Sequence, residues 1–249
     1  MQKPLCFSVF SGDARQIRLA GLLSEDSPNV TLFTADEAES AVSFGDVLVL
    51  PVKGLDADFL RELVPENKTV VSGHDFLCRE DFAVRNAVPT AEGAIQTAME
   101  NTAVTLHGSR CLVIGFGRIG RVLARMLRGI GAEVSVSARR ADDMAWLAAE
   151  GYPALNTLRL EGALSGFDMI FNTVPANVLP HARLLELGRE CLLIDLASPP
   201  GGIDKAAAEQ LGLGCIHALN LPGRVAPKSA ALILRDTLYD ILRERGYAI

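Results

Sequence analysis

A glycine pattern in the middle of the chain carries the clearest chemical signal. It follows the apolar run 111–114 and opens the stretch 118–130, whose residues keep helical spacing. In a dinucleotide fold the first glycine of such a pattern permits a tight turn, the second leaves room for a pyrophosphate, and the third lets helix and strand pack closely. The helix start also offers free N–H groups to phosphate. The residues that we predict to bind a dinucleotide here are Gly115, Gly117, Arg118, Ile119 and Gly120. The alternative is a glycine turn with no ligand.

The end of the next expected strand indicates which dinucleotide binds. Arg139 and Arg140 follow the strand-like run 133–138. At about 20 residues beyond the glycines, NAD-binding proteins usually carry an Asp or Glu for the ribose hydroxyls. Two guanidinium groups suit the 2′-phosphate of NADP instead, because it is dianionic and accepts paired hydrogen bonds. We therefore predict NADP. The alternative interpretation is that both arginines are solvated charges at the start of a helix.

Ligands of open α/β sheets bind beyond the carboxyl ends of the strands, and this rule selects further segments. The remaining residues that we predict to bind the cofactor are Asn172, Thr173, Val174, Pro175 and Ala197. The turns at 11–15, 197–202 and 221–228, and the segment 89–93, are candidates for binding a substrate. Taken singly, each also has an ordinary explanation as a loop or a helix cap.

Short apolar runs alternate with helix-like stretches, which predicts parallel sheets with helices on their faces. Strands are expected at 5–10, 30–33, 47–50, 69–71, 110–114, 133–137, 153–155, 168–172, 191–196 and 214–218. Helices are expected at 14–23, 56–63, 89–104, 118–130 and 227–245. In the long helix at 89–104, Pro89 is expected to stand just before the first helical residue.

These elements predict an α/β protein with two lobes. One is a doubly wound, parallel-sheet NADP-binding (Rossmann) domain, and the other is a smaller, flavodoxin-like α/β N-terminal domain completed by the C-terminal helix. The boundaries that we expect are 1–88 for the substrate-side N-terminal domain (completed by 227–249), 89–105 for a linking helix, 106–222 for the dinucleotide-binding domain, and 223–249 for the C-terminal helix packing back on the N-terminal domain.

Composition narrows the class of protein. The chain has 249 residues, of which 49% are hydrophobic and 22% charged, and its net charge of -6 argues against nucleic acid as the main partner. The longest N-terminal apolar run, 5–10, is too short for a signal peptide or a membrane span, so no membrane and a cytoplasmic location are expected. The five cysteines lie far apart, which indicates small buried side chains with no metal or disulfide spacing.

Several longer strings resemble a known family, the A subunits of dipicolinate synthase. The strings that carry the resemblance are Pro89-Thr-Ala-Glu-Gly-Ala-Ile, Asp195-Leu-Ala-Ser-Pro-Pro-Gly-Gly, Leu221-Pro-Gly-Arg-Val-Ala-Pro-Lys and Ser11-Gly-Asp-Ala-Arg-Gln. The chain departs from the family pattern at Pro199, Asn220 and Ala231, and its N-terminal lobe looks short.

The resemblance implies a step in spore formation. Dihydrodipicolinate, a small cyclic dicarboxylate, would be oxidised by NADP⁺ to pyridine-2,6-dicarboxylate in the mother-cell cytoplasm. A smaller, flavoprotein-like B subunit would be the partner, and a homo-oligomer is expected.

Residues for this chemistry follow from the two carboxylates of the product, which need cations and hydrogen-bond donors. The substrate-binding residues that we predict are Arg15, Thr90, Ser198, Gly223, Arg224 and Lys228. Oxidation to a pyridine removes one hydride and one proton, and Glu92 or Lys228 is the expected acceptor of the proton.

Two other functions fit parts of the sequence. A 2-hydroxyacid dehydrogenase would share the two-lobed layout, but that class needs an Arg after the fifth strand of the nucleotide domain, where Ser198, Pro199 and Pro200 stand, and an acid–base His near the last strand. A non-catalytic NADP-binding subunit that supports a flavoprotein partner would explain the lack of an obvious acid–base pair.

Overall fold

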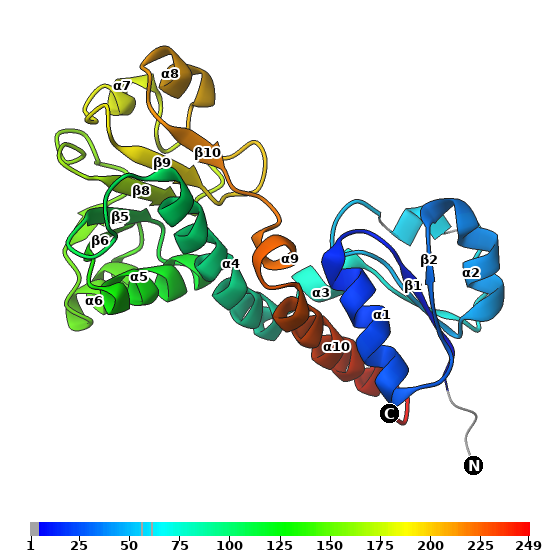
Figure 1. The fold of residues 1–249 in the computed structure, drawn as a ribbon. Helices are drawn as coiled ribbons and strands as arrows, with labels where there is room; N and C mark the ends of the chain where they lie inside the picture. The colour runs from blue at the N-terminus through cyan, green and yellow to red at the C-terminus, as the bar shows by residue number, and fades with distance from the viewer. Residues whose placement is uncertain (1–4, 56, 61) are drawn as a thin grey trace. The chain divides into compact units, whose positions relative to one another are not determined.

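The computed structural model describes residues 5–55, 57–60 and 62–249 (Figure 1). They form two compact units, of which unit 1 combines 1–89 with 222–249 and unit 2 spans 90–221. Each unit has its own parallel sheet and its own hydrophobic core. The predicted α/β class is therefore confirmed.

Unit 1 is built on a four-stranded parallel sheet with the order β2-β1-β3-β4. The strands are β1 (Phe7–Phe10), β2 (Val30–Phe33), β3 (Val47–Val49) and β4 (Thr69–Val71). The connecting helices are α1 (Ala14–Asp26), η1 (Ala35–Glu37), α2 (Ala38–Phe44), η2 (Ala57–Leu60) and α3 (Gly73–Leu77). The helix expected at 56–63 is thus a short 3-10 helix, and residues 56 and 61 lie outside the described part of the chain. This order is the flavodoxin-like one.

Alternating side chains place helices on both faces of this sheet, because successive residues of a strand point to opposite sides. Phe7 and Val9 belong to a core shared with α1 and with the last helix, α10 (Pro227–Glu244). Phe10 and Leu48 belong to a second core that includes α2. The C-terminal helix completes the N-terminal domain, as predicted.

Unit 2 is built on a six-stranded parallel sheet with the order β10-β9-β8-β5-β6-β7. The strands are β5 (Arg110–Ile114), β6 (Glu133–Ala138), β7 (Ala154–Asn156), β8 (Met169–Asn172), β9 (Leu192–Asp195) and β10 (Cys215–His217). The helices are α5 (Arg118–Ile130), α6 (Ala141–Ala149), α7 (His181–Leu184) and α8 (Lys205–Gln210). Counted from β5, this is the 3-2-1-4-5-6 order of the Rossmann fold, with its switch point between β5 and β8.

Two helices differ from the sequence prediction. Helix α4 (Glu80–Asn101) begins nine residues before Pro89, which lies inside it. An interior proline costs about 3 kcal/mol, but Phe82 is buried in the core of unit 1 while Ala91 and Ala94 are buried in the core of unit 2. Packing on both sides of the proline therefore outweighs the lost hydrogen bond. The turn expected at 221–228 contains a short helix, α9 (Leu221–Val225), before α10 begins at Pro227.

The cysteines match the prediction only in part. Cys111 and Cys191 are buried, and burial raises the pKa of each thiol to about 12, whereas Cys78 is exposed. Within the described residues no helix is long and apolar enough to cross a membrane, and no group of three or more His, Cys, Asp or Glu side chains is arranged to hold a metal ion.

Candidate cofactor site

The glycine turn joins β5 to α5 at the switch point of the unit 2 sheet. Gly115 has a φ of +100°, and a Cβ there would collide with the hydroxyl of Thr173. A Cβ on Gly120 would collide with the carbonyl oxygen of Gly115, so the helix can lie against the strand only because this side chain is absent. Gly117 is the N-cap of α5, and a Cβ added there would have no other atom within 4 Å. The turn therefore leaves open space directly beside the N–H groups of a helix start, which suits a pyrophosphate.

A pocket of about 360 Å³ opens beside this turn. It joins the carboxyl ends of β5, β6 and β8, and its lining residues are Gly115, Phe116, Gly117, Ala138, Arg139, Arg140, Asp143, Thr157, Thr173, Val174, Pro175 and Ala176. Seven of the predicted cofactor residues are among them. Arg118, Ile119, Gly120, Asn172 and Ala197 are not part of the lining.

The two arginines of the pocket are in different electrostatic states. Arg140 bonds to Asp142, with 3.0 Å from its Nε to Oδ1, and its Nε lies 4.0 Å from Asp143. The hydrogen bond and the charge of Asp142 raise the pKa of Arg140. Arg139 is exposed and has no hydrogen-bond or ion-pair partner within the described part of the chain. Of the two arginines, Arg139 is therefore the one whose guanidinium has no carboxylate partner among the described residues.

Asp195 holds two loops at this edge of the sheet, although we assigned it no role from the sequence. Its buried carboxylate accepts hydrogen bonds from Asn172 Nδ2 at 2.8 Å and from the N–H groups of Ala197, Gly202 and Ile203 at 3.1, 2.8 and 3.2 Å. Asn172 in turn bonds to both the N–H and the carbonyl of Val174 at 3.0 Å. Asn172 and Ala197, which we predicted to touch the cofactor, thus act in the framework beneath the pocket.

Other residues of unit 2 were missed or underrated. Thr157 lines the pocket and its hydroxyl donates to Ser137 Oγ at 3.0 Å. His217 bonds through Nε2 to the carbonyl of Ala197 at 2.8 Å, on the loop that carries the exposed Ser198.

The sequence did contain a signal for Asp195. It ends a buried strand and precedes a loop with two consecutive glycines, Gly201 and Gly202.

The predicted substrate residues are divided between the units. In unit 1 Arg15 forms an ion pair of 2.6 Å with Asp13, and a Cβ on Gly223 would lie 2.9 Å from that carboxylate. Burial raises the pKa of Asp13, whereas the hydrogen bonds and charge of Arg15 lower it. The lowering is the larger effect, so the pKa of Asp13 lies below its ordinary value. Arg224 and Lys228 are exposed on α9 and α10. Thr90 is buried and Glu92 exposed on the part of α4 that belongs to unit 2.

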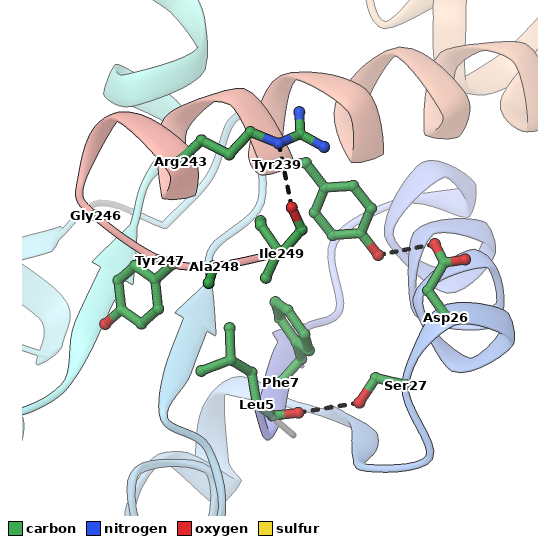
Figure 2. A pocket seen from close by; sticks show the side chains of 10 residues that line it. All are labelled: Leu5, Phe7, Asp26, Ser27, Tyr239, Arg243, Gly246, Tyr247, Ala248 and Ile249. Atoms are coloured by element: carbon green, nitrogen blue, oxygen red, sulfur yellow. Dashed lines mark hydrogen bonds between the residues drawn. The ribbon is translucent and has the colours of Figure 1, made fainter. Parts of the chain in front are cut away.

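A further pocket of about 640 Å³ lies at the opposite, amino edge of the unit 1 sheet (Figure 2). The C-terminal residues 246–249 lie across the start of β1, and Tyr239 donates to Asp26 at 2.8 Å. Burial, and then Asp26, raise the pKa of the Tyr239 phenol. No predicted site residue lines this pocket.

Comparison with known proteins identifies the family. The family model for the D-isomer specific 2-hydroxyacid dehydrogenase NAD-binding domain matches residues 77–195. The A subunit of dipicolinate synthase from Bacillus subtilis (strain 168) is 30% identical over 96% of this chain and 96% of its own length. The chain belongs to the family of dipicolinate synthase A subunits.

Two crystal structures of dipicolinate synthase A subunits share this fold. The one from Bacillus halodurans superposes with a TM-score of 0.83 at 30% identity, covering 96% of this chain and 99% of the other. The one from Bacillus subtilis gives a TM-score of 0.82 at 29% identity, covering 98% and 97%. This member of the family is an oxidoreductase with a dehydrogenase-type domain for a nicotinamide cofactor. The open space at Gly117, beside the start of α5, fits such a dinucleotide.

Proposed function

We propose that this chain oxidises dihydrodipicolinate to pyridine-2,6-dicarboxylate with NADP⁺ as the oxidant. Similarity to the A subunit of dipicolinate synthase along 96% of both chains supports the substrate. The observation that carries the cofactor choice is the unpaired Arg139 in the nucleotide pocket, beside Ala138, where an acidic residue would favour NAD. A guanidinium with no carboxylate partner offers its full hydrogen-bonding capacity to a 2′-phosphate.

The reaction removes two hydrogens from the ring. One leaves with its electron pair as hydride, for which a bound nicotinamide would be the acceptor, and the other leaves as a proton. Aromatisation favours the loss of both, so the main task of the protein is to hold the ring carbon against the cofactor.

Residues of this chain have three roles in the proposal. The N–H groups at the start of α5 bind the pyrophosphate, and Arg139 binds the 2′-phosphate. Arg15, Thr90, Ser198, Gly223, Arg224 and Lys228 remain the predicted contacts for the carboxylates. The proton goes to the exposed carboxylate of Glu92 or to Lys228, directly or through water.

The relatives are named as one subunit of a synthase, which supports a complex with a second kind of subunit. We propose that the partner is the smaller, flavoprotein-like B subunit, that the chain forms a homo-oligomer, and that it acts in the mother-cell cytoplasm of a spore-forming bacterium.

The deciding experiment is an assay of NADPH formation on freshly prepared dihydrodipicolinate, with the purified chain alone and with its partner subunit. We expect turnover with NADP⁺ at a kcat/KM above that with NAD⁺. Glu92→Gln should lower kcat if Glu92 accepts the proton, whereas Glu100→Gln, an exposed glutamate of the same helix, should not. Tight NADP binding without turnover in either preparation would overturn the dehydrogenase proposal in favour of a non-catalytic nucleotide-binding subunit. Turnover of 2-hydroxy acids instead would assign the chain to the rival enzyme class.

A further inference from the structure

A pocket that the sequence did not reveal opens at the carboxyl edge of the unit 1 sheet. It has a volume of about 710 Å³ and lies where β3 and β4 end. Its walls come from the loop 52–55 after β3, from Asp58, and from residues 72–74 and Leu77 at and within α3. In open parallel sheets this edge is where ligands bind.

The two loops that form the walls are held firmly together. A Cβ on Gly73 would collide with the carbonyl of Val52, so the first turn of α3 packs directly on the backbone after β3. Ser72 caps α3, and both its N–H and its hydroxyl donate to Asp75 at 2.7 Å. Asp75 is also paired with Arg245 beyond the end of α10. One side of the pocket is therefore formed by the start of α3 packed directly on the Val52 backbone.

Of Lys53 and Asp58, the two charged side chains on these walls, Lys53 is the one without a partner among the described residues, which favours an anion. Lys53 is exposed and has no hydrogen-bond or ion-pair partner within the described residues, and Gly54, with a φ of +102°, makes the turn beside it. His74 contacts Cys78, with 3.3 Å between Nε2 and the sulfur. Asp58 also lines the pocket, but it is already engaged in a contact of its own. Lys53 thus contrasts with Arg15, whose charge is matched by Asp13.

The remaining lining suits a ring. Leu55 and Leu77 add apolar surface to the pocket, and Leu77 is 51% exposed. A cation, an imidazole and apolar walls together match a small cyclic carboxylate, which has a charged group at its rim and an apolar face.

We propose that Lys53 and His74 bind one carboxylate of the dicarboxylate substrate in this pocket. The ammonium of Lys53 donates a charge-assisted hydrogen bond to that carboxylate, a ring N–H of His74 donates a second, and the two leucines contact the ring. This inference rests on the proposed function for the identity of the ligand, and it adds two substrate-binding residues to it.

Calorimetry tests the inference in buffer free of divalent cations. Pyridine-2,6-dicarboxylate and pyridine-2-carboxylate are each titrated into the full chain saturated with NADP. Lys53→Gln should weaken binding of the dicarboxylate about tenfold or more, as expected for a charge-assisted hydrogen bond. His74→Gln should also weaken it, but by a factor several times smaller. The preference for the dicarboxylate over the monocarboxylate should shrink in Lys53→Gln. Lys205→Gln, an exposed lysine on α8 of unit 2, is the matched control and should bind both as the original chain does.

The outcomes separate the inference from the proposed function. If the original chain binds the dicarboxylate and both variants bind it equally well, the inference is wrong and the proposed function stands. If the variants weaken the binding of NADP as much as the binding of the dicarboxylate, the pocket is not a substrate site. If the original chain neither binds the dicarboxylate nor oxidises dihydrodipicolinate, the proposed function fails and the inference fails with it.

Discussion

Individual glycines at the carboxyl edges of the two sheets have opposite surroundings. In unit 2 Gly117 faces open space beside a helix start. In unit 1 a Cβ on Gly12 would lie 2.7 Å from Pro51 Cβ, and a Cβ on Gly223 would lie 2.9 Å from Asp13. A side chain at the first glycine would project into open space, whereas a side chain at either of the others would collide with the protein itself.

The loops at the two edges are also held by different interactions. In unit 2 the buried carboxylate of Asp195 gathers two loops through hydrogen bonds. In unit 1 the loops touch backbone to backbone at Gly73, and the ion pair of Asp13 and Arg15 lies beneath Gly223. The comparison teaches that a glycine-rich turn at a strand end is not evidence of a ligand site until the space beside it is known.

The largest effect should come from removing Asp195. Asp195→Ala leaves three backbone N–H groups and the Asn172 amide without this acceptor, and we expect a loss of about 3 kcal/mol or more in the free energy of unfolding. Asp204→Ala, which removes an N-cap acceptor of α8 in the same unit, should cost about 1 kcal/mol. Urea denaturation measures both. Equal losses of unfolding free energy for the two variants would show that the hydrogen bonds of Asp195 do not hold the loops at this edge of the sheet.

The second prediction replaces one tightly packed glycine and one glycine beside open space with alanine. Gly73→Ala should lower the free energy of unfolding by about 1–3 kcal/mol, because its new methyl group overpacks against the Val52 backbone. Gly117→Ala should cost at most about 1 kcal/mol, because Ala is a poorer N-cap than Gly. It should weaken NADP binding about tenfold or more, because its methyl group occupies the space for the pyrophosphate.

Thermal unfolding and NADP titration of both alanine variants test these expectations. A stable Gly73→Ala protein would show that α3 can shift away from β3. Unchanged NADP affinity in Gly117→Ala would place the pyrophosphate elsewhere.

Much of the fold could be predicted from local pattern. Helix α5 runs from Arg118 to Ile130 as expected, because its spacing and its flanking glycines are local signals. The start of α4 could not be predicted, since Pro89 normally marks a helix start and only burial of Phe82 and Ala91 in two cores carries the helix through it.

The site was less predictable than the fold. The pattern led to Gly117 and Arg139, which line the pocket at the glycine turn. It did not lead to Asp195, whose partners lie up to 23 positions away, or to the pairing of Arg15 with Asp13 beneath Gly223. The carboxylate partners of Arg15 and Arg140 lie only two positions away in the sequence, but the close approach of Gly223 to Asp13 depends on a tertiary contact that spacing does not report.

The third prediction separates the two arginines of the nucleotide pocket. Arg139→Ala should weaken NADP binding about tenfold and NAD binding little, because only NADP carries the 2′-phosphate. Arg140→Ala should have a smaller effect, since Asp142 already binds its guanidinium. Replacing both should reduce NADP binding most. Fluorescence titration with NADPH and NADH measures these ratios, and equal losses for both cofactors would show that neither arginine reads the 2′-phosphate.

The smallest effect concerns acid stability, where the paired Arg15 of unit 1 again contrasts with the unpaired Arg139. The pKa of Asp13 is lowered from 3.8 in the folded chain. The folded state therefore binds the proton less readily than the unfolded state, and the resulting stabilisation is complete above about pH 4 and lost as the pH falls through the folded pKa. Asp13→Asn should flatten that part of the stability curve. Asp75, whose pKa is also lowered, should keep some acid dependence in the Asp13→Asn variant. Urea denaturation between pH 2.5 and pH 5 follows the difference, and identical slopes in the original chain and Asp13→Asn would mean that the Asp13–Arg15 pair adds no stability to this edge.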